Sequence, residues 1–155
     1  MKYFYDTEFL EDGRTIELIS IGIVAEDGRE YYAISEDMPY DRIAEDQWLM
    51  DNVIANLGHG RKIPKATIRD EVSEFLGAVK GCELWADYAA YDHVVLAQLF
   101  GKMMDLPPWV PMYTSDFQQE LRRLGNPPIP DQGGGVHNAL ADARYLKACA
   151  DQLGI

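Results

Sequence analysis

The chain has 155 residues, 47% of them hydrophobic, which is enough for one domain with a buried core and excludes a disordered or fibrous protein. It contains 26 acidic and 14 basic residues, a net charge of −12. This balance disfavours a protein that grips long nucleic acid through many Lys and Arg contacts to phosphates. Bound divalent cations would still allow such a chain to hold the end of one strand. We expect a single domain over residues 1–155.

The sequence also bears on location. No apolar run approaches the ~20 residues that a membrane-spanning helix needs. The first residues, MKYFYDTEF, include acids where a signal peptide would need an unbroken apolar core. Cys82 and Cys149 have no CxxC spacing and suit buried side chains in a reducing compartment. We therefore expect a cytoplasmic protein without membrane association.

The first half of the chain predicts three strands followed by a helix. KYFYDTEF, ELISIGIVA (17–25) and REYYAIS (29–35) are rich in aromatic and β-branched residues. Asp27-Gly28 favours a tight hairpin turn between the second and third strands. The apolar spacing then predicts one helix from Tyr40 to Leu57, and the basic segment HGRKIPK after it is expected to be a loop.

The second half predicts alternating helices and strands. An amphipathic helix is expected from an N-cap at Thr67 to Gly81, then a strand at 83–88 and a helix at 91–101. PMYTSDFQQELRRLG predicts a short strand and a helix, and a last helix follows the Pro- and Gly-rich loop 125–135. This order predicts an α/β fold with a mixed sheet, three antiparallel strands and then parallel strands, flanked by helices.

Two acids, Asp6 and Glu8, stand two residues apart on the first predicted strand. Side chains at this spacing share one face of a strand, so both carboxylates project side by side from an aromatic-rich segment. Buried carboxylates without a partner are costly, and no Lys or Arg is interleaved beyond Lys2. A hard divalent cation is the natural partner. The alternative is a strand end at which both acids face water.

Three further groups stand near helix starts. Asp92 falls in the first turn of the helix at 91–101, where it also suits the helix dipole. Asn138 is a good N-cap, which places His137 in the Gly-rich loop and Asp142 inside the last helix. Residues five apart on a helix are rotated by ~140°, so His137 and Asp142 do not share a face. The pattern predicts a fixed carboxylate with a movable proton acceptor above it, or a His137 that is only a loop residue.

The combined pattern is more specific than its parts. D-x-E on the first strand, an aspartate opening a mid-chain helix, and H-x-A-x-x-D at the last helix occur in this order. With these motifs the chain resembles the DEDDh 3′→5′ exonucleases of the ribonuclease H-like fold, and among them the bacterial ribonuclease AS group, which acts on 3′ poly(A). The segments with this likeness are YFYDTEFLEDGRTIELISIGIVAEDGREYYA, ELWA…AYDHVVLAQLFG…LPPWVP and HNALADAR. The likeness is weaker over 36–66 and 112–135.

The resemblance implies a ribonuclease H-like domain that hydrolyses phosphodiesters with two metal ions and releases nucleoside 5′-monophosphates, AMP above all. It implies two Mg²⁺ ions, for which Mn²⁺ can substitute. By motif, the metal-binding carboxylates are Asp6, Glu8, Asp92 and Asp142, with Asp6 bridging both ions, and the general base is His137. The implied partner is the 3′ end of single-stranded RNA, and the family suggests a homodimer.

Aromatic side chains near the acids are candidates for stacking on RNA bases, and these are Phe9, Trp85 and Tyr88. Asp87 is interpreted as an incidental extra acid, and His59 and His93 as surface residues. The basic side chains of the segment 59–65 are candidates for phosphate contacts, although a solvated loop is the favoured interpretation. These candidates are Arg61, Lys62 and Lys65.

Two other functions stay open. The same chemistry could act on DNA 3′ ends or on short oligoribonucleotides, because no residue pattern here reports a 2′-hydroxyl. A non-catalytic RNA-binding or interaction domain of the same fold is the second alternative. The complete acidic set with its histidine argues against it, since buried like charges serve no purpose there.

Overall fold

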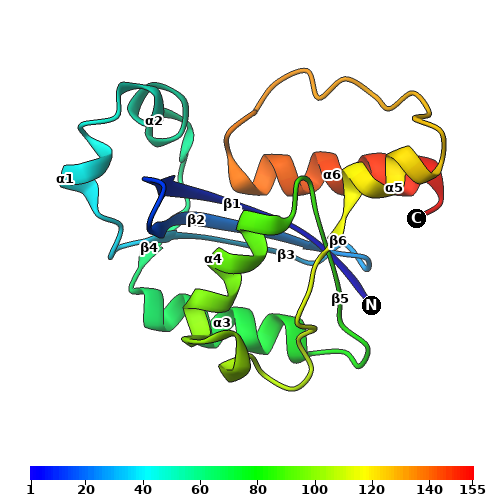
Figure 1. Cartoon of the computed structure of the whole chain (residues 1–155), viewed down its shortest axis with the longest axis horizontal. Helices are drawn as coiled ribbons and strands as arrows, with labels where there is room; N and C mark the ends of the chain where they lie inside the picture. Colours follow the sequence, from blue (N-terminus) through cyan, green and yellow to red (C-terminus); the bar gives the residue numbers. More distant parts are fainter.

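A computed structural model describes all 155 residues, with one sheet between two layers of helices (Figure 1). The strands are β1 (Lys2–Glu11), β2 (Ile16–Ala25), β3 (Glu30–Ser35), β4 (Arg61–Ile63), β5 (Glu83–Ala86) and β6 (Ser115–Asp116). The helices are α1 (Tyr40–Ile43), α2 (Gln47–Asn52), α3 (Lys65–Gly77), α4 (Ala90–Phe100), α5 (Phe117–Arg123) and α6 (Ala139–Leu153), with 3-10 turns η1 (Ile54–Asn56) and η2 (Met103–Asp105). No helix is long and apolar enough to cross a membrane.

The sheet has the order β4-β3-β2-β1-β5-β6. β1, β2 and β3 pair antiparallel, whereas β4, β5 and β6 each pair parallel to their neighbours. The predicted mixed sheet of ribonuclease H-like topology is therefore confirmed. β1 lies inside the sheet, between β2 and β5, so side chains on both of its faces are covered by helices.

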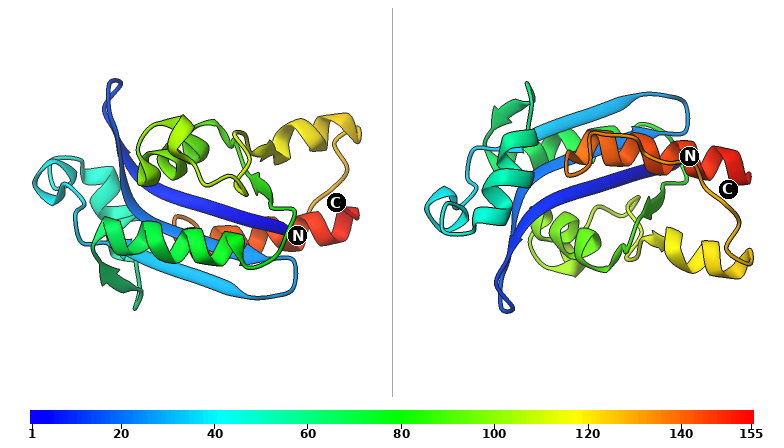
Figure 2. Two further views of the ribbon diagram at one scale, coloured as in Figure 1. Left: turned by 90° about the horizontal axis from the view of Figure 1, so that it is seen from below. Right: turned by 90° about the horizontal axis from the view of Figure 1, so that it is seen from above.

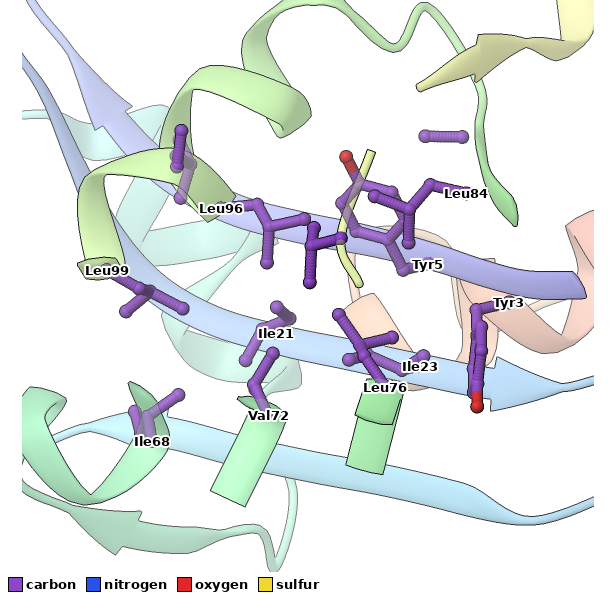
Figure 3. Packing of buried hydrophobic residues seen from close by; sticks show 14 of the residues in the cluster. Tyr3, Tyr5, Ile21, Ile23, Ile68, Val72, Leu76, Leu84, Leu96 and Leu99 are labelled. Atoms are coloured by element: carbon purple, nitrogen blue, oxygen red, sulfur yellow. The ribbon is translucent and has the colours of Figure 1, made fainter. Parts of the chain in front are cut away.

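The two faces of β1 serve different purposes, because alternate residues point to opposite sides. Its odd-numbered residues face α3 and α4, where Tyr3 and Tyr5 are almost fully buried (Figure 3). Around them lies a cluster of aliphatic side chains from the sheet and both helices: Ile21, Ile23, Ile68, Val72, Leu76, Leu84, Leu96 and Leu99. This packing is the largest source of hydrophobic stabilisation in the fold.

The even-numbered residues of β1 face α5 and α6, which cover the opposite side of the sheet from α3 (Figure 2). Phe4 begins this face and packs in a smaller cluster with Trp85, Phe117 and Leu146. Asp6 and Glu8 follow Phe4 along the same face. Beyond them, Leu10 is buried in another cluster with Ile19 and Ile34, so the two acids lie between two apolar clusters.

The prediction of one continuous helix from Tyr40 to Leu57 is wrong, because this segment forms α1, α2 and η1 instead. Asp46 adopts an extended backbone between α1 and α2, and its side chain accepts a hydrogen bond from the Leu49 N–H, which starts α2 anew. The short helices bury their apolar residues against the outer end of the sheet, in a cluster with Leu10, Ile19 and Ile34. The apolar spacing of this segment is that of one helix, but packing of its apolar residues against the end of the sheet favours separate short helices.

Several other boundaries differ from prediction. The segment expected to be a basic loop contains β4, which extends the sheet beside β3. α3 begins after Pro64 rather than at Thr67, because Pro is compatible with a helix start, and it ends at Gly77 rather than at Gly81. The strand predicted at 83–88 stops at Ala86, where the chain turns toward α4.

Candidate active site

Three carboxylates meet above the middle of the sheet, those of Asp6, Glu8 and Asp142. One oxygen from each lies within 4.8 Å of the others. Asp6 and Glu8 come from the same face of β1, as the D-x-E spacing predicts, and Asp142 comes from the first turn of α6. Residues far apart in the sequence therefore form one acidic cluster.

The position of α6 depends on a glycine of β2. Gly22 is the ladder partner of Asp6, and a Cβ on it would lie 2.3 Å from the backbone N of Leu140 and 2.4 Å from its Cα. The first turn of α6 therefore rests on the bare backbone of the sheet. Asn138 caps this turn by accepting a hydrogen bond from the Ala141 N–H, as predicted, and its amide also donates to the Asn56 carbonyl.

Asp92 reaches the cluster from the start of α4 and is 5% exposed. Its Oδ1 accepts from both the N–H and the hydroxyl of Thr7, at 2.9 and 2.6 Å. β5 pairs with β1 only as far as Phe4. Beyond that point, the Asp92 carboxylate rather than a neighbouring strand accepts the hydrogen bond from the Thr7 backbone N–H. Asp92 lies outside the group of three oxygens, but its charge still raises the pKa of both Asp6 and Glu8.

The four acids hold negative charge that no basic side chain balances. Burial, together with the other carboxylates, raises the pKa of Asp6 well above its ordinary value and that of Glu8 to about 8. Burial raises the pKa of Asp92 to about 6, against the opposing effect of Thr7, and it also raises the pKa of Asp142. The ion pairs of Lys and Arg all lie elsewhere. Clustered oxygen donors with unbalanced charge are a possible site for a hard divalent cation.

His137 stands outside α6, as predicted, in the left-handed region with φ of +64°. Its backbone N–H donates to Asp142 Oδ2 at 2.9 Å, which ties the loop to the cluster. Its ring makes an edge contact with Trp48 of α2, with centroids 4.9 Å apart. The other oxygen of Asp142 accepts a hydrogen bond from the Gln132 amide.

Two hollows flank the acidic cluster and share four lining residues, Asp6, Asp87, His137 and Asp142. The first, the aromatic cleft, has a volume of about 370 Å³ and lies on the Glu8 side. Its other lining residues are Thr7, Glu8, Phe9, Trp48, Leu49, Tyr88, Tyr91 and Asp92. The second, the α5–α6 cavity, has a volume of about 290 Å³ and extends beneath the loop 125–136.

Of the three candidate stacking residues, two line the aromatic cleft and one does not. Phe9 and Tyr88 line the aromatic cleft, and Tyr88 is 69% exposed. Trp85 is buried in the core under α5 and α6, with its Nε1 donating to Glu83 at 2.7 Å, and it does not reach the cleft. Trp48 stands at the cleft instead. The sequence offers no signal for Trp48 at this site, because its position depends on how the segment from Tyr40 to Leu57 folds over the end of the sheet.

Other interpretations also change. Asp87, interpreted as an incidental acid, lines both hollows and accepts a hydrogen bond from Gln118 at 2.7 Å. His93 is half-buried rather than a surface residue, with Nδ1 3.0 Å from the Thr114 hydroxyl, whereas His59 is exposed as expected. The basic candidates of segment 59–65 line neither hollow, since Arg61 pairs with Glu71, Lys65 pairs with Glu17, and Lys62 is exposed on β4.

The sheet order is that of the ribonuclease H-like topology, and the acids of its internal strand form part of a possible cation site. The chain belongs to the family described as the 3′-5′ exoribonuclease Rv2179c-like domain, whose model matches residues 1–153. Two relatives from Mycobacterium tuberculosis are each 47% identical over 149 residues, covering 93% of this chain and 88% of the relative. They are the 3′-5′ exoribonuclease Rv2179c of strain H37Rv and the 3′-5′ exoribonuclease MT2234.1 of strain CDC 1551. The predicted enzyme class is confirmed by this family.

Proposed function

We propose that the protein shortens single-stranded RNA from its 3′ end, 3′ adenylate tails above all, and releases nucleoside 5′-monophosphates. The observation behind this proposal is the convergence of Asp6, Glu8 and Asp142 within 4.8 Å beside Asp92, in a family of 3′-5′ exoribonucleases. The preference for adenylate rests on the resemblance to the ribonuclease AS group.

Every donor in this set is a carboxylate oxygen, the type of ligand that hard cations prefer. From this chemistry and the resemblance we infer two Mg²⁺ ions, with Mn²⁺ as a substitute. Asp6, Glu8 and Asp142 would hold one ion, and Asp6 with Asp92 the other. When bound, such ions neutralise charge on the phosphodiester and stabilise the leaving oxygen. They would also explain how a chain with a net charge of −12 binds RNA.

The remaining steps belong to the residues of the chain. An imidazole nitrogen of His137 would accept a proton from the attacking water, because its ring lines both hollows beside the acids. The hydrogen bond from its backbone to Asp142 keeps the ring close to the cluster. Thr7 holds Asp92 in place by two hydrogen bonds, so that this acid keeps one oxygen free.

The aromatic cleft is the proposed site of the terminal nucleotide. Its volume is about 370 Å³, against about 290 Å³ for the α5–α6 cavity. Phe9 and Tyr91, which contact each other with ring centroids 6.0 Å apart, and the exposed Tyr88 offer surfaces for stacking on a base. Glu8, next to Phe9, offers an acceptor to the free 3′-hydroxyl that only the last nucleotide has.

The test is nucleotide release from 5′-labelled poly(A), poly(U) and poly(C) with Mg²⁺, with Mn²⁺ and with a chelator. We expect poly(A) to be shortened fastest, with release of AMP, and the chelator to stop the reaction. Equal rates on the three polymers would reduce the function to a general exoribonuclease. Matched DNA and very short oligoribonucleotides test the two closest alternatives, and faster degradation of DNA would contradict the proposal.

A further inference from the structure

The α5–α6 cavity is not used by the chemistry above, although it opens on the same acids. Figure 1 shows the loop between α5 and α6 arching over this part of the molecule. Beneath that loop, the apolar side of the cavity is formed by Phe117, Leu146, Ile129 and the ring of Tyr145. The Tyr145 hydroxyl donates to the Pro130 carbonyl at 2.8 Å, which fixes the loop to α6.

The size and lining of this cavity suit a ring with a polar edge. Its volume is about 290 Å³ and half of its lining residues are hydrophobic. Phe117 and Leu146 are buried in the core below, so the apolar surface is held rigidly. Polar groups lie along the rim shared with the acidic cluster. Such a mixture of apolar walls and a few fixed polar groups is typical of small-molecule and base-binding pockets.

The two hollows meet at the acidic cluster, and this arrangement indicates which nucleotide of the substrate would enter each hollow. A phosphodiester held over Asp6 and Asp142 would lie on the wall that both hollows share. The nucleosides on either side of it would then enter different hollows. With the terminal nucleotide in the aromatic cleft, the nucleoside on the 5′ side of the scissile phosphate faces the α5–α6 cavity.

The rim of the cavity carries a hydrogen-bonded pair, Asp87 and Gln118, that offers acceptors to a ligand. The Gln118 amide donates to Asp87 Oδ1 at 2.7 Å, which orients the amide and leaves its carbonyl oxygen and Asp87 Oδ2 as acceptors. An exocyclic amino group has two N–H donors and matches this pair. A carbonyl oxygen at the same place, as in hypoxanthine or uracil, has no N–H for these acceptors and would bring its lone pairs against those of Asp87 Oδ2. Only the second N–H of the Gln118 amide is left to donate to it, so it should bind less well than an amino group.

We propose that the α5–α6 cavity binds the base of the penultimate nucleotide, and that Asp87 and Gln118 select a base with an exocyclic amino group, as in adenine. This inference rests on the proposed exoribonuclease function and gives it a basis for preferring adenylate over uridylate; it predicts no preference over cytidylate, whose base also has an exocyclic amino group. It assigns Asp87 to specificity rather than to the metal cluster, and it gives the loop 125–136 a role in substrate binding.

The test uses a 5′-labelled oligoadenylate with one inosine at the terminal, the penultimate or the third position from the 3′ end. Inosine replaces the amino group of adenosine by a carbonyl and leaves the sugar and backbone unchanged. The rate of the first cleavage should fall about tenfold with penultimate inosine and change little with the other two. Equal rates on all three oligomers, or slowing only at the terminal position, would overturn the inference.

Variants of the acceptor pair sharpen the test. Asp87→Asn introduces an N–H donor and should remove or reverse the discrimination against penultimate inosine, and Gln118→Leu should weaken it. Gln119→Leu is the matched control on the same helix, because Gln119 does not line the cavity, and it should keep the wild-type ratio. Melting curves identify any variant that fails to fold. An Asp87→Asn variant that folds and keeps the full discrimination would contradict the assignment.

The outcome also separates this inference from the proposed function. If the all-adenosine oligomer is not shortened, the exoribonuclease proposal fails, whereas the cavity can still be tested by binding. The affinities of the three inosine oligomers are then compared with that of oligoadenylate in the presence of Ca²⁺. Weaker binding with penultimate inosine supports the cavity, and equal affinities overturn it.

Discussion

Asp6 on β1 lies directly opposite Gly22 on β2, and the first turn of α6 rests on that glycine. The distance between the acids of β1 and Asp142 is therefore set by the absence of a side chain at position 22. Any Cβ there would meet backbone atoms of Ala139 and Leu140, which cannot rotate away. The geometry of the acidic cluster thus depends on a residue that has no chemical role in it.

Gly22→Ala should push α6 away from the sheet and separate Asp142 from Asp6. We expect a loss of ~1–3 kcal/mol of stability from overpacking and a large loss of nuclease activity. The measurements are thermal unfolding and nucleotide release. Gly134→Ala is the control, because a Cβ there meets nothing within 4 Å, and it should behave nearly as wild type. A fully active Gly22→Ala protein would contradict this account.

Asp6→Asn and Asp142→Asn should each abolish nuclease activity without unfolding the protein. Each change removes a carboxylate from the cluster, and in the absence of cations it also relieves repulsion between buried like charges. The melting temperature of Asp6→Asn without cations at pH 8 should therefore equal or exceed that of the wild type. Retained activity, or a collapse of stability in both variants, would show that these acids serve the fold instead.

Substitution of Asp92 should also affect stability, unlike that of Asp6 and Asp142, because Asp92 accepts two hydrogen bonds from Thr7. Asp92→Ala should abolish activity and lower stability, since the buried N–H and hydroxyl of Thr7 lose their acceptor, at ~1–3 kcal/mol for each unsatisfied group. Asp92→Asn keeps an acceptor oxygen and should be inactive but more stable than Asp92→Ala. Equal stability of the two variants would mean that the contact with Thr7 contributes little.

Without added cations, stability should fall as the pH rises from about 5 to about 8. The folded state raises the pKa of Glu8 from 4.5 to about 8 and that of Asp92 from 3.8 to about 6. A group with a raised pKa binds its proton more tightly when folded, so its contribution is present at low pH and is lost as the pH passes the raised value. Exposed acids whose pKa is lowered by folding, such as Asp12 and Asp27, stabilise the folded protein throughout this pH range, and their contribution is lost only at lower pH.

Millimolar Mg²⁺ or Mn²⁺ should reverse this loss, with a larger rise in melting temperature at pH 8 than at pH 5, because carboxylates must lose their protons to bind cations. Ca²⁺ should stabilise the protein without supporting turnover. The measurement is a series of melting curves across pH with chelator and with each cation. Identical curves with chelator and with metal at pH 8 would argue strongly against a cation site.

His137→Ala should slow hydrolysis by ~10²–10⁴-fold at neutral pH, the usual effect of losing a general base. Stabilisation by cations should persist, since the backbone N–H that binds Asp142 remains. His137→Asn is a second variant, because Asn tolerates the positive φ better than Ala. The exposed His59→Ala is the control and should be fully active. Nearly full activity of both His137 variants would remove the proposed role, and a weakened response to cations would indicate a metal ligand instead.

Local patterns in the sequence predict several features of the site. The period of two places Asp6 and Glu8 on one face of β1, and Asn138 starts α6 so that His137 stays in the loop. The order of elements determined the mixed sheet. These features depend on backbone periodicity and on capping by neighbouring residues, and both act over a few positions in the chain.

Which distant residues join the acids depends on tertiary packing. It placed Trp48 rather than Trp85 at the aromatic cleft, and it brought Asp87 and Gln118 together at the rim of the second cavity. It also divided the segment from Tyr40 to Leu57 into short helices that fold over the end of the sheet. The physical reason is that these choices depend on how helices pack on a twisted sheet, which local spacing does not report.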